Sequence, residues 1–385
     1  MEIIYEVQVA INLLKQHNHE AYLVGGWLRD YFLERKSDDY DLCTSALVVE
    51  IREIFKDYQV IMSGATWGCV TVIINEITIQ ITTFRTDGQY LDYRKPNSVS
   101  FSKSLSEDLK RRDFTINTLA YNDDSGLIDL YGAKSDIENE LICCVGDANQ
   151  RFQEDALRML RALRFASILN FTIEENTSRA IFTNKALLNK LSKERITKEF
   201  LLMIKGNNFN NIIDKYLSTL QIVIPELKPK LASYDFQDDN LNLVYLFKTY
   251  SNQELKQIIT KRLIISKQSQ KEILLLSECY YSSNVASREK VLSLLNKLQD
   301  KLFEKLILLW SLDRSVNEII KVYQRVKDQC YLTKDLEIDG NDLKELGYQG
   351  ALIGQLKELL LILVIKGKLV NKKTELINYI KETLY

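Results

Sequence analysis

The first residues of the chain predict a helix, a strand and a second short helix. Apolar residues recur at helical spacing across residues 2–16, which is typical of an amphipathic helix. The run EAYLV at 20–24 then predicts a short buried strand. Gly25-Gly26 interrupts this strand, and the residues after it predict a short helix that ends near Leu33. Two adjacent glycines are therefore expected between a buried strand and a helix start.

Two more strand signals follow in the same part of the chain. The run DDYDL at 38–42 predicts a second short strand. Between residues 69 and 84, apolar and polar side chains alternate on both sides of Asn75-Glu76. Alternation with period two around a polar pair predicts a β-hairpin.

The pattern changes after about residue 135. No glycine occurs between Gly206 and Gly340, and no proline occurs after Pro229. Leu, Ile, Lys and Glu dominate this stretch and recur with helical periodicity. The sequence therefore predicts an α+β fold, with a mixed head of about 135 residues followed by a long all-helical region.

Length and composition narrow the class of protein. A chain of 385 residues predicts roughly two to three domains. The net charge of −1 means that any phosphate contact must come from local clusters of Lys and Arg. Six cysteines without C-x-x-C spacing favour reduced thiols, and two histidines argue against His-based metal sites and triads. The longest apolar run is short for a membrane span, so we expect a cytoplasmic protein.

Two motifs in the head suggest phosphate and metal binding. In LVGGWLRD (23–30), Gly25 and Gly26 permit close backbone approach to a phosphate, and Arg29 adds a charged donor. The alternative for this motif is an ordinary tight turn. In SDDYDL (37–42), Asp39 and Asp41 lie on one face of the predicted strand. Two such carboxylates suit Mg²⁺, and two ions would clamp a phosphoryl transfer; the alternative is a solvated acidic turn.

Two further motifs carry arginines next to acids or amides. In RRDFTINTLAYN (111–122), two arginines supply charge for phosphates, and Asp113 and Asn117, four apart on a helical turn, are candidates for ribose hydroxyls. A capped helix start is the alternative for this segment. In FQEDALRMLRALRF (152–165), two acids precede three arginines at helical spacing. The second motif is also compatible with a salt-bridged surface helix. Its residues of interest are Glu154, Asp155, Arg158, Arg161 and Arg164.

Taken together, these motifs resemble the class II tRNA nucleotidyltransferase family. The resemblance rests on LVGGWLRD, DDYDLCT, TTFRTDGQYLDYRKPNSVSF, DLKRRDFTINTLAY and RFQEDALRMLRALRFA, in this order and at similar spacing. It continues in LSKERITKEF (191–200) and in residues 336–371. The family contains the CCA-adding enzymes and the bacterial poly(A) polymerases, and this chain is most similar to a bacterial CCA-adding enzyme.

The resemblance implies a domain organisation and a reaction. It implies a polymerase β-like nucleotidyltransferase head with a mixed sheet, followed by an elongated helical neck, body and tail. The expected ranges are 1–137 for the head, 138–205 for the neck, 206–330 for the body and 331–385 for the tail. The implied activity adds C, C and A to the 3′ end of tRNA from CTP and ATP and releases pyrophosphate. The implied partners are tRNA, CTP and ATP, with no membrane and no protein partner.

The resemblance also implies a role for each motif residue. Asp39 and Asp41 would be catalytic and would hold two Mg²⁺ ions. Asp155 would accept from the exocyclic amine of cytosine or adenine, and Arg158 would donate to the ring nitrogen beside it. Guanine and uracil invert this donor–acceptor pattern, so the pair would reject them. The nucleotide-binding set would be Gly25, Gly26, Arg29, Arg111, Arg112, Asp113, Asn117, Glu154, Asp155, Arg158, Arg161 and Arg164.

Some features depart from the family pattern or leave alternatives open. Gln80 stands where members commonly have an acid before T-T-[FL]-R, and WGCV (67–70) replaces the usual H-G-T-V. The segment TDGQYLDYRKPNSV (86–99) is typical of members that complete the CCA end. A poly(A) polymerase and a partial CC- or A-adding enzyme remain alternatives. So does a catalytically degenerate, tRNA-binding relative, because Gln80 cannot supply a third negative charge.

Overall fold

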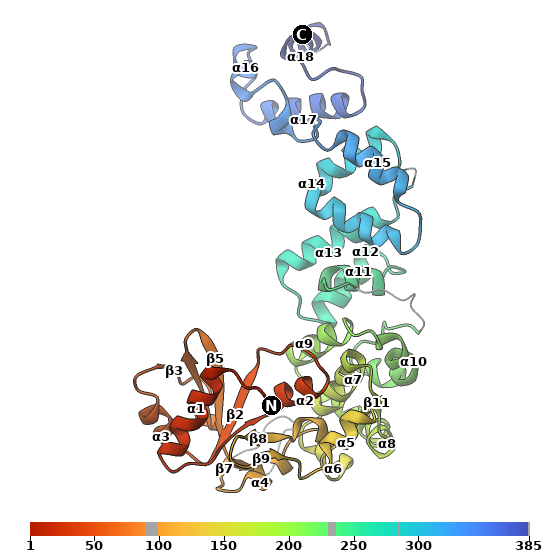
Figure 1. Cartoon of the computed structure of the whole chain (residues 1–385). Helices are drawn as coiled ribbons and strands as arrows, with labels where there is room; N and C mark the ends of the chain where they lie inside the picture. The colour runs from red at the N-terminus through yellow and green to blue at the C-terminus, as the bar shows by residue number, and fades with distance from the viewer. Residues whose placement is uncertain (89–98, 230–235, 284, 384–385) are drawn as a thin grey trace. The chain divides into compact units, whose positions relative to one another are not determined.

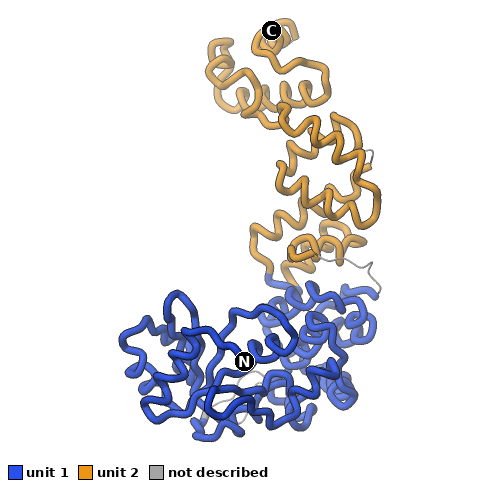
Figure 2. Tube along the Cα trace, in the orientation of Figure 1, with its two compact units in different colours: residues 1–235, 262–264 blue, residues 236–261, 265–385 orange. Residues whose placement is uncertain are grey.

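The protein folds into two compact units. The computed structural model describes residues 1–88, 99–229, 236–283 and 285–383. Unit 1 contains residues 1–235 and 262–264, and unit 2 contains residues 236–261 and 265–385 (Figure 2). All the described strands lie in unit 1, whereas the regular structure described in unit 2 is helical (Figure 1). The predicted α+β class, with a mixed head before a helical region, is confirmed.

Unit 1 is built on a mixed seven-stranded sheet in the order β3-β4-β5-β2-β1-β8-β9. β2 and β5 run parallel, and the other neighbouring strands run antiparallel. Two small sheets accompany it: β6 pairs with β7, and β10 pairs with β11. The strands of the large sheet are β1 (Ala21–Val24), β2 (Tyr40–Thr44), β3 (Gln59–Ile61), β4 (Cys69–Ile74), β5 (Ile77–Thr83), β8 (Ala120–Asn122) and β9 (Gly126–Ile128). The small sheets contain β6 (Arg85–Asp87), β7 (Val99–Phe101), β10 (Leu141–Ile142) and β11 (Thr172–Ile173).

The helices of unit 1 surround this sheet and continue beyond it. α1 and α3 pack against its strands, and α7 packs against α9. The predicted helix at 2–16 begins later than its apolar pattern, because Ile4 is still extended. The helices are α1 (Tyr5–Gln16), α2 (Gly26–Phe32), α3 (Val48–Ile54), α4 (Leu105–Lys110), α5 (Ala133–Glu138), α6 (Ala148–Glu154), α7 (Leu157–Leu169), α8 (Glu175–Asn184), α9 (Lys193–Met203) and α10 (Phe209–Leu220).

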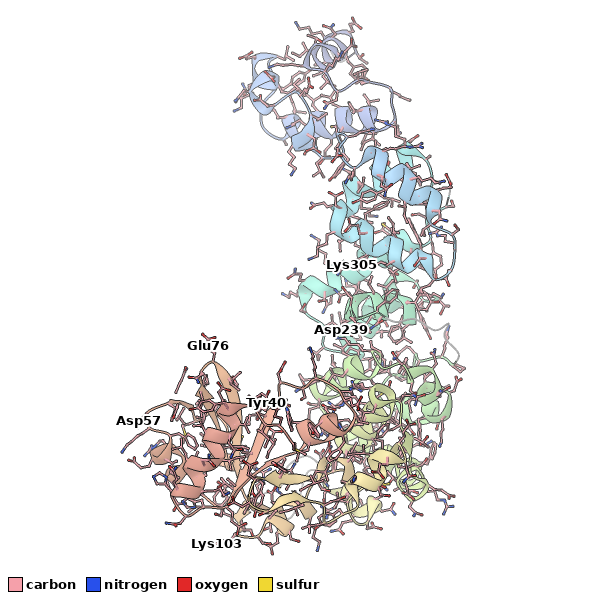
Figure 3. All side chains as sticks on the ribbon, in the orientation of Figure 1. Tyr40, Asp57, Glu76, Lys103, Asp239 and Lys305 are labelled. Atoms are coloured by element: carbon pink, nitrogen blue, oxygen red, sulfur yellow. The ribbon has the colours of Figure 1, made fainter. Side chains whose placement is uncertain are left out.

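The predicted hairpin is confirmed as β4 and β5. Asn75 and Glu76 have φ angles of +46° and +68°. Two positive φ angles are what a two-residue type I′ turn requires, and its twist matches that of the flanking strands. Figure 3 labels Glu76 at the tip of this hairpin. The hairpin fixes the register in which Gln80 lies opposite Thr71.

The strand predicted at 38–42 lies two residues later in the structure. β2 begins at Tyr40, so Asp39 precedes the strand and Asp41 is its second residue. Tyr40 and Leu42 are buried on one side of the strand, whereas Asp41 is partly exposed. Burial of these apolar neighbours anchors β2, while Asp39 is exposed at its start.

Unit 2 consists of helices around an aromatic and aliphatic core. Tyr245, Phe247, Phe303 and Trp310 are almost fully buried, and the Trp310 indole Nε1 donates to the Tyr280 carbonyl at 2.7 Å. The chain breaks from helical geometry at Gln299, where φ is +59°. The helices are α11 (Asp239–Leu246), α12 (Asn252–Gln257), α13 (Lys267–Tyr280), α14 (Arg288–Ser311), α15 (Asn317–Val326), α16 (Gly340–Glu345), α17 (Ala351–Ile365) and α18 (Lys373–Thr383).

Two expectations from the sequence, on the domain limits and on a subtype loop, stay predictions. The division into head, neck, body and tail at 137, 205 and 330 stays a prediction. Most of the segment 86–99, which was expected to be a subtype loop, lies outside the described residues. Across the described ranges, no helix is both long enough and apolar enough to cross a bilayer.

Candidate active site

A single cavity of about 850 Å³ in unit 1 brings the head motifs together. It is lined by the end of β1, the start of β2, the RRD segment at 111–113 and the first turns of α7. All the predicted site residues line this cavity except Glu154. The predicted residues that line it are Gly25, Gly26, Arg29, Asp39, Asp41, Arg111, Arg112, Asp113, Asn117, Asp155, Arg158, Arg161 and Arg164.

The backbone at Gly25 lies beside two charged groups of the cavity. Its φ angle is +79°, a left-handed conformation that glycine adopts without a Cβ clash. A Cβ atom at Gly25 would lie 3.4 Å from Arg112 Nη1 and 3.5 Å from Asp41 Oδ2. The absence of a side chain therefore keeps open the space beside a carboxylate and a guanidinium.

Asp41 has an unusual protonation equilibrium. Burial raises its pKa, the neighbouring Asp39 carboxylate raises it further, and Arg112 partly offsets both effects, which gives a pKa of about 6. Both carboxylates line the cavity, Asp39 from the residue before β2 and Asp41 from within the strand. That these two carboxylates hold one metal site stays a prediction.

Gln80 lies beside this pair of carboxylates. Its Cα is opposite that of Asp41 in the parallel pairing of β2 with β5, and it lines the same cavity. Its Oε1 accepts from the Cys69 thiol, with an S···O distance of 4.0 Å. Trp67 and Cys69, from the unusual WGCV segment, also line the cavity. The residue that departs from the family pattern is therefore part of the site.

The two arginines of the RRD segment are anchored by Asp108, a residue that the sequence analysis did not single out. Arg111 donates to Asp108 Oδ1 from Nε at 3.0 Å and from Nη2 at 2.6 Å. Arg112 donates from Nη2 to Asp108 Oδ2 at 3.3 Å and from Nη1 to the Asn117 carbonyl at 3.1 Å. Asp108 lies at i−3 and i−4 from the two arginines, and this spacing was the available signal.

Asp113 and Asn117, the candidates for contacts with ribose hydroxyls, belong to a chain of hydrogen bonds. The predicted helical turn is a short 3₁₀ helix (Thr115–Asn117). Asn117 Nδ2 donates to Asp113 Oδ1 at 3.1 Å, Arg29 Nη1 donates to Asn117 Oδ1 at 2.9 Å, and Arg161 Nε donates to Asp113 Oδ2 at 2.6 Å. Burial would raise the pKa of Asp113, but Arg161, Asn117 and Arg158 lower it to about 2.

The predicted continuous helix through Glu154, Asp155 and Arg158 is wrong. α6 ends at Glu154, Asp155 is extended with φ −138° and ψ 105°, and α7 begins at Leu157. The Asp155 side chain bonds the Leu157 amide at 3.0 Å, an Asx-type contact that competes with helix continuation. Asp155 therefore lies in a break between two helices instead of sharing a helix face with Arg158.

The two expected base-contacting residues are held by different partners. Arg158 Nη1 donates to Glu154 Oε2 at 2.6 Å, four residues earlier in the chain and across the helix break. Arg195 Nη2 donates to Asp155 Oδ2 at 2.7 Å. Arg195 lies on α9 within LSKERITKEF, a segment that had no assigned role. The sequence contained no signal for a pairing across 40 residues.

Three arginines surround the ring of Phe165 at the wall of the cavity. The guanidinium carbons of Arg29 and Arg161 lie 5.2 Å from the ring centroid, and that of Arg164 lies 4.3 Å from it. Cation–π contacts of this kind hold guanidinium groups that would otherwise repel one another. Burial lowers the pKa of Arg164, although Glu199, at 3.2 Å from its Nε, opposes the shift. The cavity is strongly cationic on this side.

Known proteins share both the sequence and the fold of this chain. The family described as "Poly A polymerase head domain" matches residues 21–143, and "Probable RNA and SrmB- binding site of polymerase A" matches residues 170–231. A CCA-adding enzyme of Bacillus mycoides (strain KBAB4) is 32% identical over 98% of both chains. The chain belongs to the CCA-adding enzyme family.

Other members of the CCA-adding enzyme family match in part or in fold. A Geobacillus sp. (strain WCH70) CCA-adding enzyme is 44% identical over 57% of this chain and 54% of that relative. The structure of the Bacillus stearothermophilus CCA-adding enzyme in complex with CTP has a TM-score of 0.81 and 26% identity, and the match covers 98% of this chain and 96% of that one. The family and the nucleotidyltransferase head expected from the motifs are confirmed.

Proposed function

We propose that this member of the CCA-adding enzyme family is a CCA tRNA nucleotidyltransferase. It adds C, C and A to the 3′ end of tRNA from CTP and ATP and releases pyrophosphate. The observation that carries the proposal is one cavity that holds a carboxylate pair, an arginine-rich wall and the Asp155–Arg158 elements together. The relatives named CCA-adding enzymes and the CTP complex of the Bacillus stearothermophilus protein support the same activity.

Asp39 and Asp41 fit a divalent cation site. Their repulsion raises the pKa of Asp41 after burial has already done so, and a cation between them would relieve both effects. Hard carboxylate oxygens suit Mg²⁺, which completes its coordination with water and nucleotide phosphates. We assign two Mg²⁺ ions to these residues; when bound, they activate the tRNA 3′-hydroxyl and neutralise charge on the leaving pyrophosphate.

The cationic wall binds and orients the triphosphate. Arg29, Arg111 and Arg112 present guanidinium donors to one cavity, beside the space left open at Gly25. Guanidinium groups bind phosphate oxygens through paired, charge-assisted hydrogen bonds. Arg161 and Arg164 extend the same positive field, and Asp113 and Asn117 are the residues that we assign to the ribose. Correct placement of the α-phosphate relative to the 3′-hydroxyl supplies most of the protein's share of catalysis.

Asp155 and Arg158 read the base. A carboxylate accepts up to about four hydrogen bonds, so Asp155 can keep Arg195 and still accept from the exocyclic amine of C or A. Arg158 is fixed by Glu154 and by the Arg151 carbonyl at 3.2 Å, and it donates to the ring nitrogen. Guanine and uracil present an oxygen to the carboxylate and an N–H to the guanidinium. Glu154 acts by holding Arg158, which agrees with its position outside the cavity lining.

The tRNA is bound by phosphate contacts and by shape, and its binding extends to unit 2. Exposed lysines at the end of the chain supply a candidate surface, although Lys373 is already paired with Asp342 at 2.5 Å. A tRNA substrate places the enzyme in the cytoplasm. The lysines of this surface are Lys366, Lys368, Lys372, Lys373 and Lys381.

The experiment that tests the function uses purified protein, Mg²⁺ and a tRNA that ends at the discriminator base. CTP alone, ATP alone and both nucleotides are supplied, and the 3′ ends are sequenced. We expect two cytidines with CTP and a single closing adenosine only when both nucleotides are present. Bound tRNA without incorporation would instead identify a degenerate relative.

A poly(A) polymerase is the second candidate, because the matched head domain is described by that name. It would extend tRNA or other RNA with a long A-tail from ATP alone. Termination at two cytidines would identify a partial CC-adding enzyme, and addition of adenosine only to a CC end would identify an A-adding enzyme. The same sequencing experiment separates these activities from full CCA addition.

A further inference from the structure

Asp108 is a buried carboxylate that contacts both arginines of the RRD segment. Its side chain is inaccessible to solvent, and it lies on α4, one helical turn before Arg111. Besides the two guanidinium groups, its Oδ1 accepts from the Arg85 main-chain N–H at 3.4 Å. We propose that Asp108 is a positioning residue that sets Arg111 and Arg112 toward the triphosphate of the incoming nucleotide. This inference rests on the proposed function.

The cost of burying Asp108 argues for a role beyond stability. Its chain neighbour Leu109 belongs to an apolar cluster with Cys43, and both residues are fully buried. Burial would raise the pKa of Asp108, but Arg111 and Arg112 lower it, so the carboxylate remains ionised. Buried ion pairs generally stabilise a fold no more than apolar side chains of similar volume do. What this ion pair provides is a fixed direction for two flexible side chains.

The contacts hold both arginines in place and leave one terminal nitrogen of Arg111 for a ligand. Arg111 uses Nε and Nη2 on Asp108, and within the described residues its Nη1 makes no hydrogen bond. Arg112 is held at both terminal nitrogens, by Asp108 and by the Asn117 carbonyl. Both side chains line the cavity, and each forms an ion pair with Asp108. Pre-orientation of this kind reduces the entropy that is lost when a phosphate binds.

Asp108 has a second effect, on Asp41. Arg112 Nη1 and Asp41 Oδ2 flank the same point beside Gly25, within 3.4 Å and 3.5 Å of a Cβ built there. Because both groups border the same space, we expect Arg112 to turn toward Asp41 if no other acid competed. Asp108 provides the competing charge, so Arg112 stays oriented while Asp41 remains open toward the cavity. Removal of the Asp108 charge would therefore displace Arg112 from the proposed phosphate site. It would also let Arg112 block Asp41.

The test measures nucleotide and phosphate binding by the full chain with Asp108→Asn. Isothermal titration with CTP, UTP and inorganic tripolyphosphate in Mg²⁺ gives three dissociation constants. We expect CTP and tripolyphosphate to weaken by the same factor, roughly tenfold or more, because both depend on the arginines. The ratio of UTP to CTP dissociation constants should stay unchanged, because Asp155 and Arg158 are intact. Loss of that ratio would reveal a general structural defect and overturn the inference.

A second variant and a control keep the test decisive. Asp108→Glu retains the charge but moves the carboxylate by one methylene, so it should fold and weaken tripolyphosphate binding less than Asp108→Asn does. If Asp108→Asn does not fold, Asp108→Glu decides the question. Unchanged tripolyphosphate binding by Asp108→Glu would then overturn the inference. Glu272→Gln is the control, since it removes one of two acidic partners of Lys305 in unit 2, the other being Asp238 at 2.6 Å. It should lower stability without changing tripolyphosphate affinity.

The same data separate this inference from the proposed function. A wild-type protein that binds neither CTP nor tripolyphosphate contradicts the proposed function itself. A wild-type protein that binds both, together with an Asp108→Asn variant of equal affinity, contradicts only the role of Asp108.

Discussion

Arg158 donates from Nη2 to the main-chain carbonyl of Arg111 at 3.1 Å. This hydrogen bond joins the proposed base-reading arginine on α7 to the segment that carries the phosphate-binding arginines. The ion pair of Arg161 with Asp113 at 2.6 Å makes a second connection between the same two segments. The residues proposed to bind the base and the triphosphate therefore belong to one connected network. If they have these roles, we expect a displacement of Arg158 by a wrong base to reach the phosphate site.

Asp155→Asn should weaken the choice of base. The amide has one acceptor oxygen and two donor hydrogens. It can therefore donate to the carbonyl that uracil presents where cytosine has its exocyclic amine. We expect the preference for CTP over UTP in kcat/KM to fall by a factor that corresponds to roughly 1–3 kcal/mol. Asp147→Asn is the matched control, because Asp147 caps α6 through Gln150 and asparagine caps equally well. An unchanged CTP preference in Asp155→Asn would refute the assignment.

Arg195→Met should act through Asp155. The substitution keeps a long apolar stem but removes the donor that holds Asp155 Oδ2. We expect kcat/KM for CTP to fall roughly tenfold in the wild-type background and hardly at all in Asp155→Asn, which is a coupling of roughly 0.5–3 kcal/mol in a double-mutant cycle.

The control for this cycle is Arg179→Met. Arg179 forms an ion pair with Glu175 on the exposed face of α8, where both side chains are mostly accessible. Exposed pairs contribute little to stability, so this variant should retain full activity. Additive losses for Arg195→Met and Asp155→Asn would mean that Arg195 acts elsewhere.

Gln80→Glu should couple the stability of unit 1 to divalent cations. The new carboxylate would lie opposite Asp41, which already repels Asp39. We expect the Tm of the variant to drop below that of the wild type in EDTA and to recover in Mg²⁺, with half-saturation at a lower Mg²⁺ concentration. Gln59→Glu, on the exposed edge strand β3, is the control and should show no Mg²⁺-dependent recovery. Equal Tm shifts in EDTA and Mg²⁺ would separate Gln80 from the metal site.

Asp113 should contribute to stability in a pH-dependent way. Its pKa in the folded protein is about 2, below its ordinary value of 3.8, because Arg161 and Asn117 outweigh burial. A carboxylate with a lowered pKa stabilises the fold above the unfolded value, and this contribution is lost as the pH falls from about 4 toward 2. Asp113→Asn should therefore lower the free energy of unfolding by about 2 kcal/mol at pH 7, and by less near pH 3.

Urea unfolding at several pH values measures this contribution. Asp57→Asn is the control, since Asp57 is an exposed carboxylate of the head (Figure 3). The difference between Asp113→Asn and wild type should shrink with acid, whereas Asp57→Asn should stay close to wild type throughout. A constant difference for Asp113→Asn across the pH range would rule out its ionisation as the cause.

Local patterns were sufficient for the elements whose physics is local. Alternation about Asn75-Glu76 predicted the β4–β5 hairpin, because period-two burial and a turn with two positive φ angles are both encoded within a few residues. The adjacent glycines before Arg29 likewise marked the end of a strand and the start of a helix, where Gly25 has a φ angle of +79° and α2 begins at Gly26. Motif residues that line one cavity were found from their chemistry and from the family resemblance.

Contacts between distant segments were decided only by the tertiary structure. The helix pattern across Glu154 and Asp155 is continuous in sequence, yet the chain breaks there, because the side chain of Asp155 bonds the Leu157 amide and Arg195 arrives from 40 residues away. The burial of Asp108 against two arginines became visible only in the tertiary structure. The sequence by itself determined which chemical groups this protein carries and in which local elements. The packing of α4, α7 and α9 determined how those groups are paired, since burial makes an unpaired charge too costly to leave without a partner.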